Sequence, residues 1–356
     1  MKRIIWLAAV LASLNLSQFT HAEIHTSGFA SIVGGRTISG DGDQFLADYS
    51  SVGFYGDELT FQPESVVGIQ FMADLEEGLR FTTQMVSRGL TSFNTEVDYA
   101  YLTYDLSPSW FVQAGRKRLP LQYYSEFFDV GFSYPWIRPP ADLYTWQVLN
   151  YNGISVTNKM ALGGSSLNTT FFTGREDSEN NRLLSTFFYG EPVTEVWKNI
   201  LGVRFDWNMD IYQLLLSYTT FDLDRFFTDP NTTETNVEDS EAKFYAASFN
   251  VDTGDWFVLT EWNKYDSDRF KTENWLASAG YRIGMVTPYL ASSEFKEEPV
   301  TSGATFEEHT TQSAGIRYDF HPQAALKVQY DDVNDKGSLA LAGDSQSVTV
   351  AVDLVF

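Results

Sequence analysis

Residues able to perform nucleophilic or acid–base catalysis are few and scattered in this chain. The sequence has no cysteine, and its histidines beyond residue 22 are His25, His309 and His321. Catalysis of the Ser–His or Asp–His type requires a histidine beside its partner at one fixed site, and no spacing in the sequence brings such a pair together. The sequence therefore predicts no enzyme, no cofactor and no metal site.

Charged residues instead recur on the polar face of short alternating segments. They are Arg80, Arg204, Asp206, Arg282, Arg317 and Lys327. If this face lines water, the cations could form a basic ladder that guides anions. The alternative is a solvated wall whose charges pair across neighbouring strands, and for any single arginine we favour that alternative.

The segments that carry these charges alternate between apolar and polar residues, which predicts β-strands. Val67, Ile69 and Phe71, for example, alternate with Gly68 and Gln70. Sixteen such strands are expected, at 24–33, 65–75, 79–87, 96–105, 109–116, 150–157, 166–174, 200–208, 211–220, 242–251, 255–264, 273–283, 287–294, 310–320, 324–332 and 346–356.

The connections between these strands alternate in length. Those after even-numbered strands are tight, apart from 158–165, whereas the connections at 34–64, 117–149, 175–199 and 221–241 are long. A transmembrane β-barrel has an even number of antiparallel strands, short periplasmic turns and long external loops. We therefore predict an all-β fold, a transmembrane antiparallel barrel of about sixteen strands.

Aromatic residues favour this barrel over a soluble β-sandwich or propeller. They are expected on the outer face in two groups, one near the short turns (Trp207, Tyr212, Phe249, Trp256, Tyr281, Tyr318 and Phe356) and one near the long loops (Tyr218, Tyr245, Trp262, Trp275 and Tyr330). Two aromatic belts around an aliphatic band are typical of outer-membrane barrels. The interior of so wide a barrel is expected to hold water, so inward Ser217 should tolerate a charge that outward Leu216 would not.

Residues 1–22 are predicted to be a secretory signal peptide, because a basic start is followed by an apolar stretch and small residues. Residues 23–356 are then a single barrel. Loss of Lys2 and Arg3 changes the net charge from −23 to −25, which argues against a nucleic-acid partner. Acidic residues cluster in one long connection (Asp222, Asp224, Asp229, Glu234, Glu238, Asp239 and Glu241). They could bind lipopolysaccharide through divalent cations, although we favour a solvated, repulsive outer surface.

Three stretches resemble the outer-membrane porins of Gram-negative bacteria. The stretches VDYAYLTY (97–104) and AGRKRLP (114–120) are similar to the strand pair before the porin constriction loop. The terminal VAVDLVF (350–356) is similar to the signal that the barrel-assembly machinery reads, with Phe356, Leu354 and Val352 as its key positions. The resemblance implies a homotrimer in lipid and lipopolysaccharide, with the third loop (117–149) folded into the pore. GFSYPWIRPP (131–140) differs from the acidic, glycine-rich loop tip of the general diffusion porins.

The resemblance also implies where the pore narrows. The cations Arg116, Lys117 and Arg118 directly precede the third loop, and Glu126 and Asp129 on that loop would face them across a narrow water column. Opposed charges there create a transverse field that sorts solutes by charge. An inward Arg116 requires Gln113 to point outward, so either a β-bulge intervenes or this strand faces a neighbouring subunit.

These observations predict an outer-membrane porin for passive diffusion of small hydrophilic solutes and ions. Two alternatives stay open. The inward arginines are compatible with a channel selective for small anions such as dicarboxylates or phosphate. A barrel with a plugged lumen could instead have a structural or adhesive role.

Overall fold

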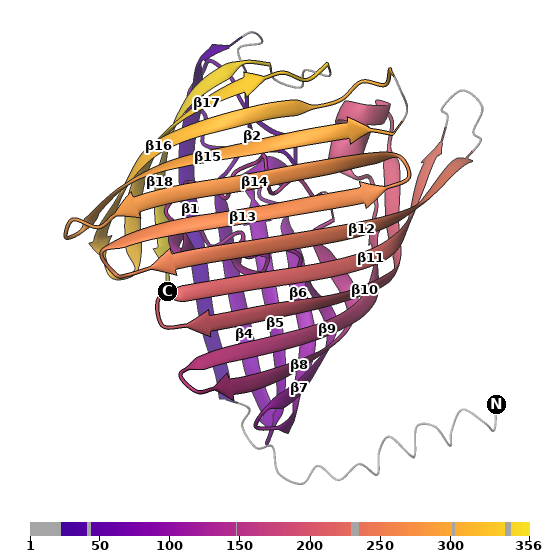
Figure 1. Ribbon diagram of the computed structural model, residues 1–356, viewed down its shortest axis with the longest axis vertical. Helices are drawn as coiled ribbons and strands as arrows, with labels where there is room; N and C mark the ends of the chain where they lie inside the picture. Colours follow the sequence, from indigo (N-terminus) through magenta and orange to yellow (C-terminus); the bar gives the residue numbers. More distant parts are fainter. Residues whose placement is uncertain (1–22, 41–43, 147, 229–234, 301–302, 339–342) are drawn as a thin grey trace, which may run out of the picture.

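The alternating segments form strands that close into one antiparallel barrel (Figure 1). The computed structural model describes residues 23–40, 44–146, 148–228, 235–300, 303–338 and 343–356, so the expected signal peptide, 1–22, lies outside the described residues. In the described chain sixteen strands pair in sequence order, and β1 closes the barrel by pairing with both β4 and β18. The predicted fold class and the number of barrel strands are confirmed.

The barrel strands and the short elements between them follow one another along the chain. They are β1 (Glu23–Gly40), β2 (Phe45–Asp48), β3 (Gly53–Tyr55), β4 (Val66–Glu76), β5 (Leu79–Arg88), η1 (Gly89–Thr91), β6 (Thr95–Ser107), β7 (Trp110–Arg118), η2 (Ser125–Phe127), η3 (Gly131–Ser133), β8 (Asn150–Leu162), β9 (Ser165–Ser178), η4 (Leu184–Tyr189), β10 (Val193–Met209), β11 (Tyr212–Thr228), β12 (Thr235–Asp252), β13 (Trp256–Ser267), β14 (Phe270–Tyr281), β15 (Val286–Pro299), β16 (Glu308–His321), β17 (Ala324–Asp335) and β18 (Ser345–Val355).

Several strands are longer than the sequence predicts, mostly at the long-loop end. The expected loop at 221–241 is wrong, because β11 and β12 pair from Tyr212↔Val251 to Thr228↔Thr235 and extend beyond their neighbours at the right of Figure 1. Asp222, Asp224, Asp239 and Glu241 therefore lie in strands, and Asp229 and Glu234 lie outside the described residues. The expected connection at 158–165 is also wrong, because β8 and β9 pair as far as Leu162↔Ser165. Polar residues beyond the apolar band continue the hydrogen-bond ladder between strands. Apolar–polar periodicity ends where the apolar band ends, so it does not show where the strand itself ends.

The outer face of the barrel is apolar and carries many of the expected aromatic residues. Trp256, Tyr281 and Phe356 are exposed near the short turns, and Tyr218 and Tyr330 are exposed toward the long loops. Exposed aliphatic side chains such as Leu216 lie between them. No helix in the described residues is long and apolar enough to cross a membrane.

The inside of the barrel contains two apolar clusters rather than only water. The first loop, between β1 and β4, carries the hairpin β2–β3. The third loop, which begins at residue 119 because β7 reaches Arg118, packs on inward side chains of the wall. One cluster joins Leu121 and Trp146 of this loop to Trp197, Phe221 and Phe244 of the wall. The other joins loop aromatics such as Tyr124 and Trp136 to wall residues such as Tyr289. The expected water-filled interior is therefore wrong for this part of the lumen.

Candidate functional site

The third loop crosses the lumen and contacts the wall far from its own strands. The Trp136 indole donates to Ser278 Oγ of β14 at 3.1 Å, and the Ile137 amide donates to Gln329 Oε1 of β17 at 3.0 Å. Near the start of the loop, the Tyr123 amide donates to Glu261 of β13 at 3.0 Å. These contacts tie the loop to the wall opposite β7, so it is a fixed obstacle inside the barrel.

Three of the expected pore-lining cations bind the backbone of this loop. Arg204 donates to the Gln122 carbonyl at 3.0 Å, and Arg317 donates to the carbonyls of Phe132 and Tyr134 at 2.7 and 3.0 Å. Lys327 donates to the carbonyls of Gly131 and Trp136, both at 2.6 Å, and forms an ion pair with Asp353 at 2.8 Å. Loop carbonyls that have no partner in a strand are satisfied in this way. These cations hold the loop in place and do not form a free basic ladder.

The remaining pore-lining candidates form ion pairs with neighbouring acids. Arg80 bonds to Asp105 at 3.0 Å, and Arg204 bonds to Asp206 at 2.7 Å. Arg282 bonds to Asp252 at 2.7 Å at the short-turn end of the barrel. The Arg80 and Arg282 pairs join different strands or their ends, which is the pairing that the sequence offered as the alternative to a basic ladder, whereas Arg204 and Asp206 pair along the inner face of β10.

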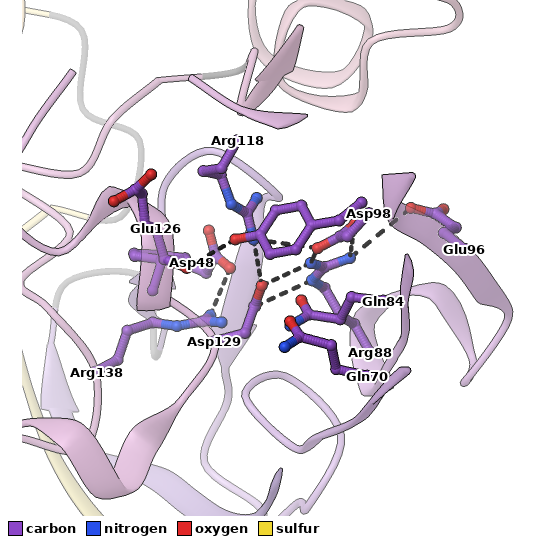
Figure 2. Close-up of polar contacts among 12 residues, drawn as sticks. Asp48, Gln70, Gln84, Arg88, Glu96, Asp98, Arg118, Glu126, Asp129 and Arg138 are labelled. Carbon is purple, nitrogen blue, oxygen red and sulfur yellow. Dashed lines mark hydrogen bonds and ion pairs between the residues drawn. The ribbon is translucent and has the colours of Figure 1, made fainter. Parts of the chain in front are cut away.

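The loop acid Asp129 lies between two wall arginines in a compact charge cluster (Figure 2). Arg88 of β5 and Arg118 of β7 contact its carboxylate at 2.7 and 2.6 Å. Both arginines also contact Asp98 of β6, at 2.6 and 3.1 Å. Burial alone would raise the pKa of Asp129, but the two guanidinium groups outweigh it and lower that pKa below its ordinary value.

This geometry brings Arg118 and Asp129 into direct contact, with no water column between them. A second pair on the same loop, Arg138 with Asp48 of β2, closes at 2.5 Å and fastens the first-loop hairpin onto the third loop (Figure 2). Because their charges are neutralised in contact, these groups contribute little to a transverse field.

Arg116 and Lys117 point to different faces of β7. Arg116 pairs with Ala100 of β6, whereas the inward Tyr101 pairs with Gly115, so alternation puts Arg116 on the outer face. Its guanidinium bonds to Glu176 of β9 at 2.7 Å. Lys117 lies on the inner face, where its ammonium donates to Gln113 and to Ser155, the latter at 2.8 Å. Gln113 therefore points inward, and Arg116 outward.

Glu126 is the loop acid whose carboxylate has no hydrogen-bond or ion-pair partner among the described residues. Its side chain is exposed and points away from Asp129 in Figure 2. Its backbone carbonyl accepts from the Tyr99 hydroxyl at 2.7 Å, which fixes the position of the residue. Glu126 is thus the free charge that the third loop presents to solvent in the lumen.

The C-terminal residues lie where the barrel closes. Leu354 and Val352 pair with Ala30 and Ile32 of β1. The amide of Phe356 donates to the Gly28 carbonyl at 3.0 Å, and the Gly28 amide donates back at 2.7 Å. The Phe356 ring covers Gly28 so closely that a Cβ there would lie 2.3 Å from it. A larger residue at position 28 would have to displace this ring.

Sequence reasoning missed several partners inside the lumen. His309 was expected in a long connection, but it lies in β16 and its Nδ1 lies 2.8 Å from Asp142 Oδ1. Ser293 donates to the other oxygen of Asp142 and not to the histidine. No described serine is therefore hydrogen-bonded to His309 at this pair. No group of three described acidic or histidine side chains is placed to hold a metal ion.

One sequence signal did point to a packed loop. The third loop holds nine aromatic residues: Tyr123, Tyr124, Phe127, Phe128, Phe132, Tyr134, Trp136, Tyr144 and Trp146. Such a segment is too apolar to remain solvated. The sequence carries no comparable signal for Arg88 and Asp98, which reach the cluster from strand ends.

Neither a protein-family model nor a curated protein matches this sequence. Several solved structures share its fold. The outer membrane channel DcaP of Acinetobacter baumannii has a TM-score of 0.67 at 10% identity, covering 96% of this chain and 99% of its own. The anion-selective porin from Comamonas acidovorans has a TM-score of 0.58 at 12% identity, covering 94% and 100%. The in-vitro folded, trimeric form of OmpT, an outer membrane protein of Vibrio cholerae, has a TM-score of 0.60 at 10% identity, covering 94% and 99%.

Proposed function

We propose that this chain is an outer-membrane channel through which small hydrophilic solutes and ions diffuse passively, without a chemical reaction. The proposal is supported by its closed sixteen-strand barrel, a fold similar to those of solved outer-membrane channels and porins. The observation that carries the proposal is a wide barrel whose third loop is anchored inside the lumen by Arg204, Arg317 and Lys327. A fixed loop sets the width and the charge of a passage, as a constriction must.

The charge distribution supports a preference for cations. The wall cations Arg118, Arg204, Arg317 and Lys327 are each paired with a carboxylate. Lys117 has only neutral partners but is buried at 8% exposure, whereas Glu126 is unpaired among the described residues and exposed. A charge inside a narrow, low-dielectric passage acts more strongly on ions than screened charges outside. One structural neighbour is described as an anion-selective porin, but the bonded arginines here favour the opposite preference.

The proposal includes partners beyond the solute. Export through the signal peptide, insertion by the barrel-assembly machinery and contact with lipopolysaccharide follow from the proposed location. One structural neighbour is described in a trimer form. Alternation places Arg116 on the outer face, where a cation is unfavourable against lipid, so Arg116 supports a homotrimer in which a neighbouring subunit covers this face.

A plugged barrel is the second candidate function, because the two apolar clusters fill part of the lumen. Conductance of the purified protein in planar bilayers separates the candidates. Large steps in simple salt support the diffusion channel. Saturable block by a dicarboxylate or by phosphate would identify a selective anion channel, and a barrel that never conducts would have a structural or adhesive role.

A further inference from the structure

A cavity of about 180 Å³ lies inside the barrel at its long-loop end. Inward residues near the ends of β10, β11, β13, β14 and β15 form its wall. The rest of the lining comes from the end of the third loop, from Tyr49 of the first loop, and from η4 with the residue before it. An engineered apolar cavity of about 150 Å³ binds benzene. This space therefore has room for one molecule with a single aromatic ring.

Aromatic side chains form much of the lining, among them Trp146, Trp197, Tyr265 and Phe270. The Trp146 ring lies 5.1 Å from that of Tyr265, and the Tyr265 ring lies 5.0 Å from that of Phe270. Aromatic rings favour neighbours at centroid separations of about 4.5–7 Å. A ligand ring in this cavity would therefore find aromatic partners at the separations that such rings prefer.

Two polar groups of the lining are buried without a partner. The indole nitrogen of Trp146 and the hydroxyl of Thr272 have no hydrogen-bond partner among the described residues. The two residues are only 7% and 4% exposed. Buried polar atoms without partners cost free energy. A ligand oxygen that accepts from the indole and bonds to the hydroxyl would remove that cost.

One small ligand can reach both groups, because Tyr265 adjoins each of them. Its ring is a direct neighbour of the Trp146 ring. Across the β13–β14 ladder, Tyr265 is paired directly with Thr272, and both side chains are buried on the inner face. The Cβ atoms of residues paired in this way are about 4.5–5.5 Å apart. Trp146 and Thr272 are thus separated by no more than the width of one side chain.

The charged groups of the lining favour a neutral ligand. Arg225 is already paired with the fully buried Glu195 at 2.7 Å. The Glu297 carboxylate, which accepts from the Glu307 amide at 3.1 Å, brings a negative charge to the cavity and would repel an anion. An ammonium group would not satisfy the Trp146 indole, because both groups only donate hydrogen bonds.

We propose that this cavity binds a neutral, single-ring aromatic molecule that bears a hydroxyl group. Its oxygen lies between Trp146 Nε1 and Thr272 Oγ1, and its ring packs beside Tyr265 and Phe270. The site uses neither the Asp129 cluster nor Glu126, so its failure would leave the proposed channel function intact.

The test uses the purified, detergent-solubilised protein and 4-fluorobenzyl alcohol as the probe, followed by fluorine NMR. Empty micelles of the same detergent are titrated in parallel, because the probe also partitions into detergent. We expect saturable binding of one probe molecule per chain beyond the micelle signal. The anionic 4-fluorobenzoate should show no such binding.

Two variants carry the test to single groups. Thr272→Val keeps the shape of the side chain and removes the hydroxyl, and Trp146→Phe keeps an aromatic ring and removes the indole N–H. Each should weaken binding of the alcohol about threefold to tenfold, as expected for the loss of one hydrogen bond. The affinity of Thr272→Val for 4-fluorotoluene, which has no hydroxyl, should be unchanged.

The matched control is Thr349→Val on β18. The Thr349 hydroxyl is also buried, at 2% exposure of the residue, and has no partner among the described residues, but Thr349 does not line this cavity. Its affinity for the alcohol should match that of the unmodified protein.

Four results would overturn the proposal. One is the absence of saturable binding of 4-fluorobenzyl alcohol beyond that of empty micelles. Another is equally tight binding of 4-fluorobenzoate. The third is unchanged affinity for the alcohol in Thr272→Val and Trp146→Phe proteins that still run as folded barrels on unheated gels. The fourth is an equal loss of affinity in Thr349→Val, which would place the binding elsewhere.

Discussion

At the scale of single residues, Asp129 is the group on which the loop anchor depends most. It contacts Arg88 and Arg118, and the side chains of Asp129 and Arg118 are only 3% and 4% exposed. Asp129→Asn would leave Arg118 with Asp98 alone, and Arg88 with Asp98 and the more distant Glu96 at 3.8 Å. Breaking a buried pair from one side costs about 3–5 kcal/mol, so we expect a loss of this order in urea unfolding of the detergent-solubilised protein.

The control for this variant is an exposed ion pair. Asp177 bonds to Arg175 at 2.7 Å, with side chains 49% and 57% exposed. Such pairs contribute about 0–1 kcal/mol, so Asp177→Asn should hardly change the unfolding midpoint. Similar losses in both variants would show that the Asp129 cluster does not stabilise the loop.

Selectivity is the second property decided by single residues. Glu126 is exposed in the lumen without a bonded cation among the described residues, whereas Arg116 lies on the outer face with Glu176. Reversal potentials in planar bilayers should therefore move away from cation preference in Glu126→Gln. Arg116→Gln should move them less. A larger shift for Arg116→Gln would place that residue in the passage and contradict the assignment of faces.

At the scale of elements, positions on the outer face of a strand should tolerate a charged side chain differently according to their depth in the membrane. Leu216 of β11 is outward and 44% exposed in the apolar band. Arginine near the bilayer midplane costs about 2–4 kcal/mol, and less near the interface. Leu216→Arg should thus destabilise the barrel in lipid vesicles far more than Thr220→Arg, which lies on the same face beyond Tyr218. Equal losses would refute the membrane placement.

For Ser217, the inward neighbour of Leu216, the sequence predicts the face of the strand but not the partner that covers it. Alternation places it inward, and the structure agrees, but its hydroxyl donates to the Leu121 carbonyl of the third loop. Ser217→Arg should therefore displace the loop and reduce stability, contrary to the tolerance expected from sequence. Strand faces follow from a period of two because that pattern is local. The partner that covers a face comes from a segment 96 residues away, which no local pattern reports.

The difference between local patterns and contacts with distant segments also explains the rest of the site. Sixteen strands, their order and the position of the third connection follow from periodicity and from the alternation of turn lengths. The sequence placed Arg118 and Asp129 on opposite sides of a narrow water column, whereas the structure has them in direct contact at 2.6 Å. The roles of Arg204, Arg317 and Lys327 could not be foreseen, because they depend on the path of the loop backbone and not on residue type.

At the scale of the whole molecule, the last residue completes the closure of the barrel. Phe356 exchanges two backbone hydrogen bonds with Gly28 and covers it with its ring, at the end of the β1–β18 pairing. Deletion of Phe356 removes these two bonds and the aromatic end that resembles an assembly signal. We expect strongly reduced amounts of folded protein in the outer membrane, measured by unheated gel mobility of membrane fractions. Unchanged amounts would show that the terminus is dispensable.

The third loop should stay anchored inside the lumen while the barrel conducts. This can be tested with one cross-link, because the chain has no cysteine of its own. A Cβ at Gly131 of the loop would lie 2.5 Å from Ser31 Oγ of β1 and 2.3 Å from Asp353 Oδ1. Gly131→Cys with Ser31→Cys therefore places two thiols within reach of a disulfide once the Asp353 carboxylate moves aside. The measurement is single-channel conductance of the oxidised double variant before and after reduction. We predict the same open conductance in both states. A channel that is silent when cross-linked and opens on reduction would show that the loop must leave the lumen, and would contradict the account.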